Sequence, residues 1–141
     1  MRRFAGIVCA AALAAGACTP AADAADDAVP ETQIGAQVST LDSAELASMI
    51  AAGTVRLIDV RTPEEFAEGS IPGAVNLPLD RFDPAAIVDE PGKETVLFCR
   101  SGRRSGIAAE RLAAHRGTAV RHLDGGILAW AEQGQDMTPA Q

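Results

Sequence analysis

Cys99 is followed in the sequence by residues that could make its sulfur a nucleophile. The apolar run from Thr95 to Phe98 predicts a buried strand before it, and an alanine-rich segment from Ser105 predicts a helix after it. A helix N-terminus presents unpaired N–H groups and a partial positive charge. The intervening loop adds three arginines; its residues are Arg100, Ser101, Gly102, Arg103 and Arg104. All of these features favour a thiolate, so we expect a lowered pKa for Cys99.

The same loop predicts binding of a small anion. A turn that contains Gly102 can aim successive backbone amides at one point, and the arginines supply positive charge. Ser105 is expected to cap the following helix. A cysteine after a strand is otherwise often a small core residue, and arginine-rich loops are often solvated surface. The coincidence of a strand end, a glycine, an arginine cluster and a helix start favours the chemical interpretation.

The other polar and aromatic candidates are interpreted as structural. Asp59 ends a buried strand and is expected to form a hydrogen bond or an ion pair, although it could also shape the pocket. His115 and His122 are not spaced with cysteines or carboxylates as metal ligands are, so no metal site is expected. Trp130 is expected in the core. Glu65 suits the first turn of a helix and is expected to face solvent.

Alternating strand and helix signals predict the elements that position these residues. Apolar and β-branched runs predict strands at 55–60, 74–77, 95–98 and 119–123. Caps and helical spacing predict helices at 43–52, 62–69 and 105–115, a short helix from Asp83, and a last helix from Ile127. Gly125 and Gly126 are expected to form a tight turn, which could also lie near the Cys99 loop. This alternation predicts an α/β domain with a mostly parallel sheet that is covered on both faces. In such sheets ligands bind at the carboxyl ends of the strands, where Cys99 is expected.

Composition narrows the class of protein. The chain has 141 residues, which is room for one domain with a leader or tail. Its 48% hydrophobic and 22% charged residues exclude global disorder. A net charge of −7 argues against nucleic-acid binding. Away from the N-terminus no apolar run is long enough to span a bilayer, and three cysteines are too few for a disulfide scaffold.

The first 17 residues have the order of a secretory signal: two arginines, an apolar stretch and then small residues. Ala15-Gly16-Ala17-Cys18 resembles a bacterial lipoprotein box, although Ala15 stands where the box prefers Leu. We expect a signal peptide at 1–17 and export to the cell envelope or periplasm, with lipid on Cys18 as the only membrane attachment. Ordinary signal cleavage at the same bond and an uncleaved helix are the alternatives. The segment 18–37 reads as a flexible Ala/Asp tether, and 135–141 as a frayed tail.

Three segments in sequence order resemble the signatures of single-domain rhodanese-like sulfurtransferases. The loop from Cys99 to Ser105 resembles the active-site loop of that family, the segment 57–74 its first signature, and the segment 124–130 its last. The resemblance covers roughly residues 38–134, with Ser70 where the family commonly has His. It implies a single three-layer domain with a sheet of about five strands and helices on both faces, and no cofactor.

The resemblance also implies an activity, the transfer of sulfane sulfur. The Cys99 thiolate would attack thiosulfate or another persulfide donor, and the resulting persulfide would pass its outer sulfur to cyanide or a thiol, with ping-pong kinetics. The loop amides would hold the persulfide anion. Arg100, Arg103 and Arg104 would neutralise thiosulfate and the departing sulfite. A thiolate that is already formed needs no general base.

Two other functions stay open at this point. Phosphatases and arsenate reductases related to this fold have a longer loop, with an arginine six residues after the cysteine. Ser105 stands at that position here and Arg104 comes one residue earlier, so the shorter loop suits a sulfur atom better. The second alternative is a persulfide carrier, or a sensor or docking domain, that does not turn over. No second cysteine lies near Cys99 in the sequence, so the sulfur acceptor must come from outside.

Overall fold

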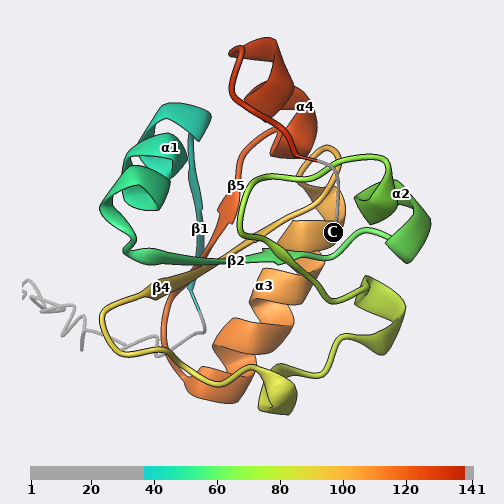
Figure 1. Cartoon of the computed structure of the whole chain (residues 1–141). Coiled ribbons are helices and arrows are strands. Elements are labelled where there is room, and N and C mark those ends of the chain that lie inside the picture. Colours follow the sequence, from blue (N-terminus) through green and yellow to red (C-terminus); the bar gives the residue numbers. More distant parts are fainter. Residues whose placement is uncertain (1–36, 139–141) are drawn as a thin grey trace, which may run out of the picture. The chain divides into compact units, whose positions relative to one another are not determined.

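A computed structural model describes residues 37–138, in which a parallel sheet lies between two groups of helices (Figure 1). The predicted signal peptide, Cys18 and the tether up to residue 36 lie outside the described residues. The strands are β1 (Val38–Leu41), β2 (Val55–Asp59), β3 (Val75–Asn76), β4 (Glu94–Phe98) and β5 (Val120–Leu123). The helices are α1 (Ser43–Ala52), α2 (Pro63–Ala67), α3 (Arg103–Arg116) and α4 (Gly126–Glu132), with 3-10 turns η1 (Leu79–Arg81) and η2 (Pro84–Ala86). Within residues 37–138 no helix is long and apolar enough to cross a membrane.

The sheet has the strand order β1-β5-β4-β2-β3, and every neighbouring pair runs parallel. The strand β4 is therefore central, with β5 on one side and β2 on the other. Its carboxyl end points into the loop that carries Cys99. The predicted α/β domain with a parallel sheet of about five strands and helices on both faces is confirmed.

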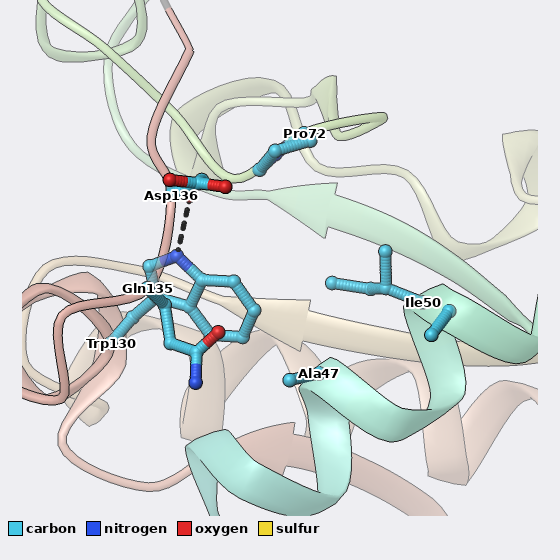
Figure 2. A pocket seen from close by; sticks show the side chains of 7 residues that line it. Ala47, Ile50, Pro72, Trp130, Gln135 and Asp136 are labelled. Atoms are coloured by element: carbon cyan, nitrogen blue, oxygen red, sulfur yellow. Dashed lines mark hydrogen bonds between the residues drawn. The ribbon is translucent and has the colours of Figure 1, made fainter.

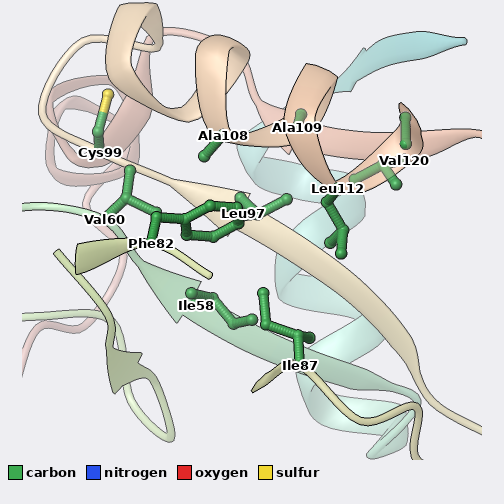
Figure 3. Close-up of a cluster of buried hydrophobic side chains, with 11 residues drawn as sticks. Ile58, Val60, Phe82, Ile87, Leu97, Cys99, Ala108, Ala109, Leu112 and Val120 are labelled. Carbon is green, nitrogen blue, oxygen red and sulfur yellow. The ribbon is translucent and has the colours of Figure 1, made fainter. Parts of the chain in front are cut away.

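The two faces of the sheet divide the core. Successive strand residues point to opposite faces, so Leu97 and Cys99 share one face while Val96 and Phe98 share the other. The first face packs against α3, whose buried apolar side chains are Ala108, Ala109, Leu112 and Ala113 (Figure 3). The second packs against α1 and α4 through Leu46, Ile127 and Trp130. This alternation directs the Cys99 thiol toward α3.

Local capping explains where the first two helices begin. The Asp42 carboxylate accepts a hydrogen bond from the Glu45 N–H at 2.8 Å at the start of α1. At α2, Thr62 and Glu65 form a capping box, in which each side chain accepts a hydrogen bond from the other's backbone N–H. Pro63 occupies the first turn of α2. These two helix starts are confirmed.

Two elements differ from the sequence expectations. The sequence predicts no element at 38–41, because only Leu41 of β1 is buried and no apolar run marks the strand. The helix α3 begins at Arg103 rather than at Ser105, because Gly102 adopts a φ of 96° and ends the loop early. Ser105 is consequently inside the helix, and its side chain is free for contacts other than capping.

The segment 135–138 is held on the domain, so the prediction of a frayed tail is wrong for these residues. The Trp130 indole donates a hydrogen bond to the Asp136 carbonyl at 2.9 Å (Figure 2). Ser70 and Thr138 exchange two backbone hydrogen bonds at 2.8 and 3.0 Å as an antiparallel bridge. Trp130 is in the core as expected, with 3% exposure. A shallow hollow of about 190 Å³ lies between Trp130 and α1.

Candidate active site

Cys99 lies immediately after β4 and is buried between that strand and α3. Its exposure is 1%, and it belongs to the same buried cluster as Val60 and Leu97 (Figure 3). The thiol is not part of a disulfide. The backbone N–H of Gly102 donates a hydrogen bond to Cys99 Sγ at 3.1 Å. The loop after the strand therefore folds back over the sulfur and presents an amide to it.

The surroundings of Cys99 favour its charged form. Burial raises the pKa of the thiol, but the backbone N–H and hydroxyl of Ser105 and the N–H groups of Ser101 and Gly102 together hold that pKa below its usual 9.0. The lowered pKa predicted from the sequence is confirmed in direction. The backbone amides expected to act on the sulfur are among the main causes and the Ser105 hydroxyl adds to them, whereas the arginine side chains expected to help are not among them.

The start of α4 orients these loop amides. The N–H of Ile127 donates to the Cys99 carbonyl at 2.9 Å, and the N–H of Leu128 donates to the Arg100 carbonyl at 3.2 Å. Both carbonyls thus point toward α4, which leaves the N–H groups of the loop free to turn toward the sulfur. The contact is so close that a Cβ on Gly126 would lie 2.4 Å from the Cys99 carbonyl oxygen. Only glycine fits at position 126, where φ is also positive, at 59°.

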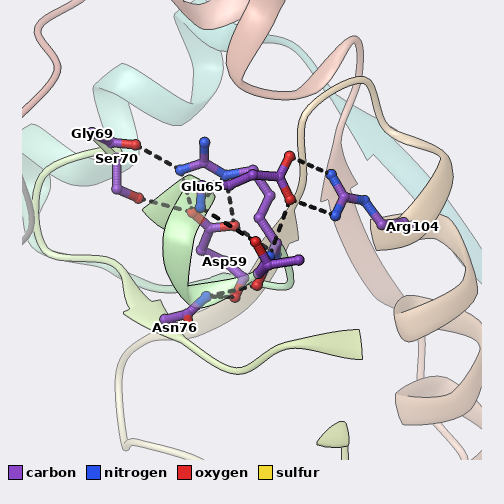
Figure 4. Close-up of polar contacts among 8 residues, drawn as sticks. Asp59, Glu65, Gly69, Ser70, Asn76 and Arg104 are labelled. Carbon is purple, nitrogen blue, oxygen red and sulfur yellow. Dashed lines mark hydrogen bonds and ion pairs between the residues drawn. The ribbon is translucent and has the colours of Figure 1, made fainter. Parts of the chain in front are cut away.

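One loop arginine is tied to α2. Arg104 donates two hydrogen bonds to the Glu65 carboxylate, at 2.7 and 2.8 Å (Figure 4). The Arg104 guanidinium is the main cause that lowers the pKa of Glu65 to about 2. The expectation that Glu65 faces solvent is therefore wrong. Because Glu65 offsets the charge of Arg104, the exposed Arg100 and Arg103 supply the remaining positive charge of the loop.

A buried ion pair supports the segment that carries Glu65. The Asp59 carboxylate is fully buried and accepts two hydrogen bonds from Arg61 Nε, at 2.9 and 3.0 Å, and one from Arg61 Nη2 at 2.6 Å (Figure 4). The Ser70 hydroxyl donates to Asp59 at 3.0 Å, and Arg61 donates to the Gly69 carbonyl at 2.7 Å. The network joins both ends of α2 to the end of β2. The structural interpretation of Asp59 is confirmed.

A groove of about 530 Å³ is lined by the segment after β2, the η1 turn and α3. Its lining residues are Val60, Thr62, Pro78, Leu79, Asp80, Arg104 and Arg111. Val60 also belongs to the cluster that contains Cys99, so the floor of the groove adjoins the surroundings of the sulfur. Arg111 is exposed and lies on α3 after Arg104. The groove therefore combines apolar side chains with two guanidinium groups and one carboxylate, that of Asp80.

A comparison with protein-family models agrees with this geometry. The model of the rhodanese-like domain matches residues 42–133, which is most of the chain. The chain belongs to the rhodanese-like family. The matched segment of this rhodanese-like domain begins just before α1 and ends just after α4.

Relatives of this rhodanese-like domain include proteins named sulfurtransferases. A sulfurtransferase from Allochromatium vinosum is 39% identical over 99 residues, which are 69% of this chain and 92% of the relative. A human thiosulfate:glutathione sulfurtransferase is 38% identical over 109 residues, and the match covers 67% of this chain and 94% of the relative. The solved structure of a human single-domain sulfurtransferase is 37% identical, with 67% and 96% covered and a TM-score of 0.55. An uncharacterized Synechocystis protein is 44% identical over 80 residues, and this match spans 57% of the chain but only 45% of that relative.

The structure brings together part of the predicted site. The amides that surround Cys99 Sγ, here called the cradle, include the N–H of Gly102, which donates to the sulfur. Ser101 contributes through its backbone N–H and has an exposed side chain. Cys18 lies outside the described residues. No cluster of three potential metal ligands occurs within the described part of the chain.

Three contributors to this site were not predicted from the sequence. They are Glu65, which binds Arg104; Arg111, which lines the groove; and His122, which contacts Ser105. These residues come from segments away from the Cys99 loop and leave no local signal. The alternative that the Gly125-Gly126 turn lies near the Cys99 loop is confirmed by the close approach of Gly126 to that loop.

Proposed function

We propose that this rhodanese-like domain is a sulfurtransferase that carries sulfane sulfur on Cys99. The observation that supports this most is the cradle around Cys99 Sγ. A buried sulfur at the carboxyl end of a central strand accepts a hydrogen bond from the Gly102 N–H at 3.1 Å, and its pKa is lowered. Such a site stabilises a thiolate, and it would stabilise the equally anionic persulfide.

In the first half-reaction the Cys99 thiolate attacks the outer sulfur of thiosulfate. A Cys99 S–S bond forms, the sulfur–sulfur bond of thiosulfate breaks, and sulfite leaves with the electron pair. No proton moves in this step. The exposed Arg100 and Arg103, with Arg111 in the groove, would offset the charges of thiosulfate and sulfite. A persulfide donor would load Cys99 in the same way and release a thiolate.

In the second half-reaction an external nucleophile attacks the outer sulfur of the persulfide. Cyanide yields thiocyanate, and a thiolate yields a new persulfide; in both cases Cys99 leaves as a thiolate. Cys99 is the one cysteine within residues 37–138, so the acceptor in this proposal is a separate molecule. The name of the human relative, thiosulfate:glutathione sulfurtransferase, favours thiosulfate as donor and a low-molecular-weight thiol as acceptor.

The geometry supports phosphoryl or arsenate chemistry less well. A tetrahedral oxyanion needs an arginine that can turn into the loop. Arg104, in the first turn of α3, is the last arginine between Cys99 and Ser105, and both of its terminal nitrogens bind Glu65.

The test is peptide mass spectrometry of the full-length chain before and after thiosulfate treatment, with Cys99→Ala as the control. We expect the peptide that contains Cys99 to gain the mass of one sulfur atom and to lose it again with cyanide. Steady formation of thiocyanate over many cycles supports an enzyme, whereas a single stoichiometric loading supports a persulfide carrier. A folded, reduced protein that gains no sulfur from thiosulfate or from glutathione persulfide overturns the proposal. Hydrolysis of p-nitrophenyl phosphate would then support the phosphatase alternative.

We also propose that the chain is exported and lipidated on Cys18, as the order of residues 1–18 indicates. Expression with an alkyne-labelled palmitate probe should label the wild-type chain and not Cys18→Ser. A membrane-free, unlabelled wild-type protein that is cleaved before Cys18 would instead support ordinary export.

A further inference from the structure

A histidine on β5 contacts the serine that lies beside the thiol. His122 Nδ1 lies 3.1 Å from the Ser105 hydroxyl oxygen, and the same oxygen lies 3.0 Å from the Gly102 carbonyl oxygen. Ser105 is fully buried in the first turn of α3. His122 pairs with Leu97 of β4 and so stands next to the strand that precedes Cys99. Its ring packs over Gly106, where an added Cβ would lie 3.7 Å from Cε1 and Nε2.

The proton inventory of these three groups allows one assignment in which both hydrogen bonds are made. A carbonyl oxygen can only accept, so the single hydroxyl proton of Ser105 is donated to the Gly102 carbonyl. The Ser105 oxygen is then the acceptor toward His122, and Nδ1 must carry the proton of that bond. An imidazole with its proton on Nε2 would take the hydroxyl proton for itself and leave the Gly102 carbonyl without it.

We propose that His122 is a positioning residue that holds the Ser105 hydroxyl as a donor toward the Cys99 loop. The Nδ1–H of His122 occupies a lone pair of the Ser105 oxygen. The hydroxyl proton therefore stays on the side of the loop, where it can turn from the Gly102 carbonyl to the sulfur once Cys99 carries a negative charge. His122 acts through Ser105 and does not contact the reacting atoms.

The surroundings of His122 keep its ring neutral, so only one of its two ring nitrogens carries a proton. Burial lowers the pKa of His122 and outweighs the opposing effect of Asp124 and Glu110, the nearby carboxylates that raise it. Toward Cys99, the Ser105 hydroxyl is among the groups that lower the pKa of the thiol. Arg104 is another positive charge that interacts with Cys99, but its guanidinium is bound to Glu65.

The proposal rests on Cys99 as the sulfur-accepting nucleophile, but its test does not require sulfur transfer. The rate of Cys99 alkylation by iodoacetamide is measured against pH in the full-length chain and read from the peptide that contains Cys99. The midpoint of this profile reports the pKa of Cys99. The variants are His122→Leu, His122→Asn, Ser105→Ala and the double variant with His122→Leu and Ser105→Ala. His115→Leu, at an exposed histidine on α3, is the matched control.

We expect His122→Leu to raise the midpoint by about half a unit to one unit, the size of one weakened hydrogen bond to a charged group. His122→Asn keeps an N–H near the place of Nδ1 and should raise it less, while His115→Leu should leave it unchanged. Because His122 acts through Ser105, His122→Leu should have no further effect in the Ser105→Ala background.

Two results would overturn the proposal. The first is a folded His122→Leu variant with an unchanged midpoint, or with the same shift in the Ser105→Ala background. The second comes from the wild-type protein and needs no variant to fold: nitrogen-15 spectra of the imidazole that place the proton of His122 on Nε2. If cysteine alkylation behaves as expected and no sulfur is transferred, the proposed function fails while the role of His122 stands.

Discussion

Replacement of Gly126 by alanine should disrupt the active-site loop as well as reduce stability. A Cβ at this position would lie 2.4 Å from the Cys99 carbonyl oxygen and 2.6 Å from the Arg100 carbonyl carbon and oxygen. All three are backbone atoms, so no side-chain rotation can relieve the contact. An ordinary contact needs the loop to move away from α4 by about 1 Å. The Gly102 N–H would then leave its position 3.1 Å from the sulfur.

The matched control is Gly53→Ala at the end of α1. Gly53 has a φ of 68°, close to the 59° of Gly126, but no heavy atom lies within 4 Å of the added Cβ. The control therefore carries only the left-handed backbone strain, about 1–2 kcal/mol. Gly126→Ala carries the same strain and an overpacking cost of about 1–3 kcal/mol. We expect Gly126→Ala to lose about 2–5 kcal/mol of the free energy of unfolding in total.

Two measurements separate these effects. Urea unfolding gives the free energy of each variant, and the pH profile of Cys99 alkylation reports whether the sulfur has kept its hydrogen bonds. We expect Gly53→Ala to leave the alkylation midpoint at the wild-type value and Gly126→Ala to raise it. If the two variants agree in both measurements, the close approach of α4 to the loop does not orient the amides, and the reasoning is refuted.

Two further predictions concern the ion pairs around α2. Asp59→Ala should leave the buried Arg61 guanidinium without its carboxylate and cost about 3–5 kcal/mol of the free energy of unfolding in urea. The control, Asp80→Ala at an exposed carboxylate, should cost less than about 0.5 kcal/mol. Equal losses would contradict the structural role of Asp59. The pKa of Glu65 is lowered from 4.5 to about 2, so Glu65 binds a proton less readily in the folded protein than in the unfolded chain. The stability from its pair with Arg104 is therefore complete above the unfolded pKa of 4.5 and is lost as the pH falls toward 2. The stability difference between wild type and Glu65→Gln should be constant near neutral pH and shrink between pH 4.5 and pH 2, and a difference that stays constant over this window would count against the pair.

The sequence predicts those parts of the fold that local physical chemistry controls. The β-branched run before Asp59 and the apolar run before Cys99 mark strands because both faces of a covered parallel sheet are buried. The Thr62-Pro63 start of α2 is readable because a cap and its partner lie within one helical turn. The strand β1 could not be predicted in this way, since it lies at the edge of the sheet and buries only Leu41.

The candidate site divides along the same line. The order of residues along the chain shows that Cys99 follows a strand, precedes a helix and stands beside a glycine-containing loop, and this is enough to predict a thiolate. The folded arrangement alone shows which distant groups hold that loop in place. The α4 amides that hold the loop, the carboxylate that binds Arg104 and the imidazole that faces Ser105 come from segments far along the chain. Such contacts depend on how the parallel strands align and how the helices pack on them, and no spacing within one segment carries that information.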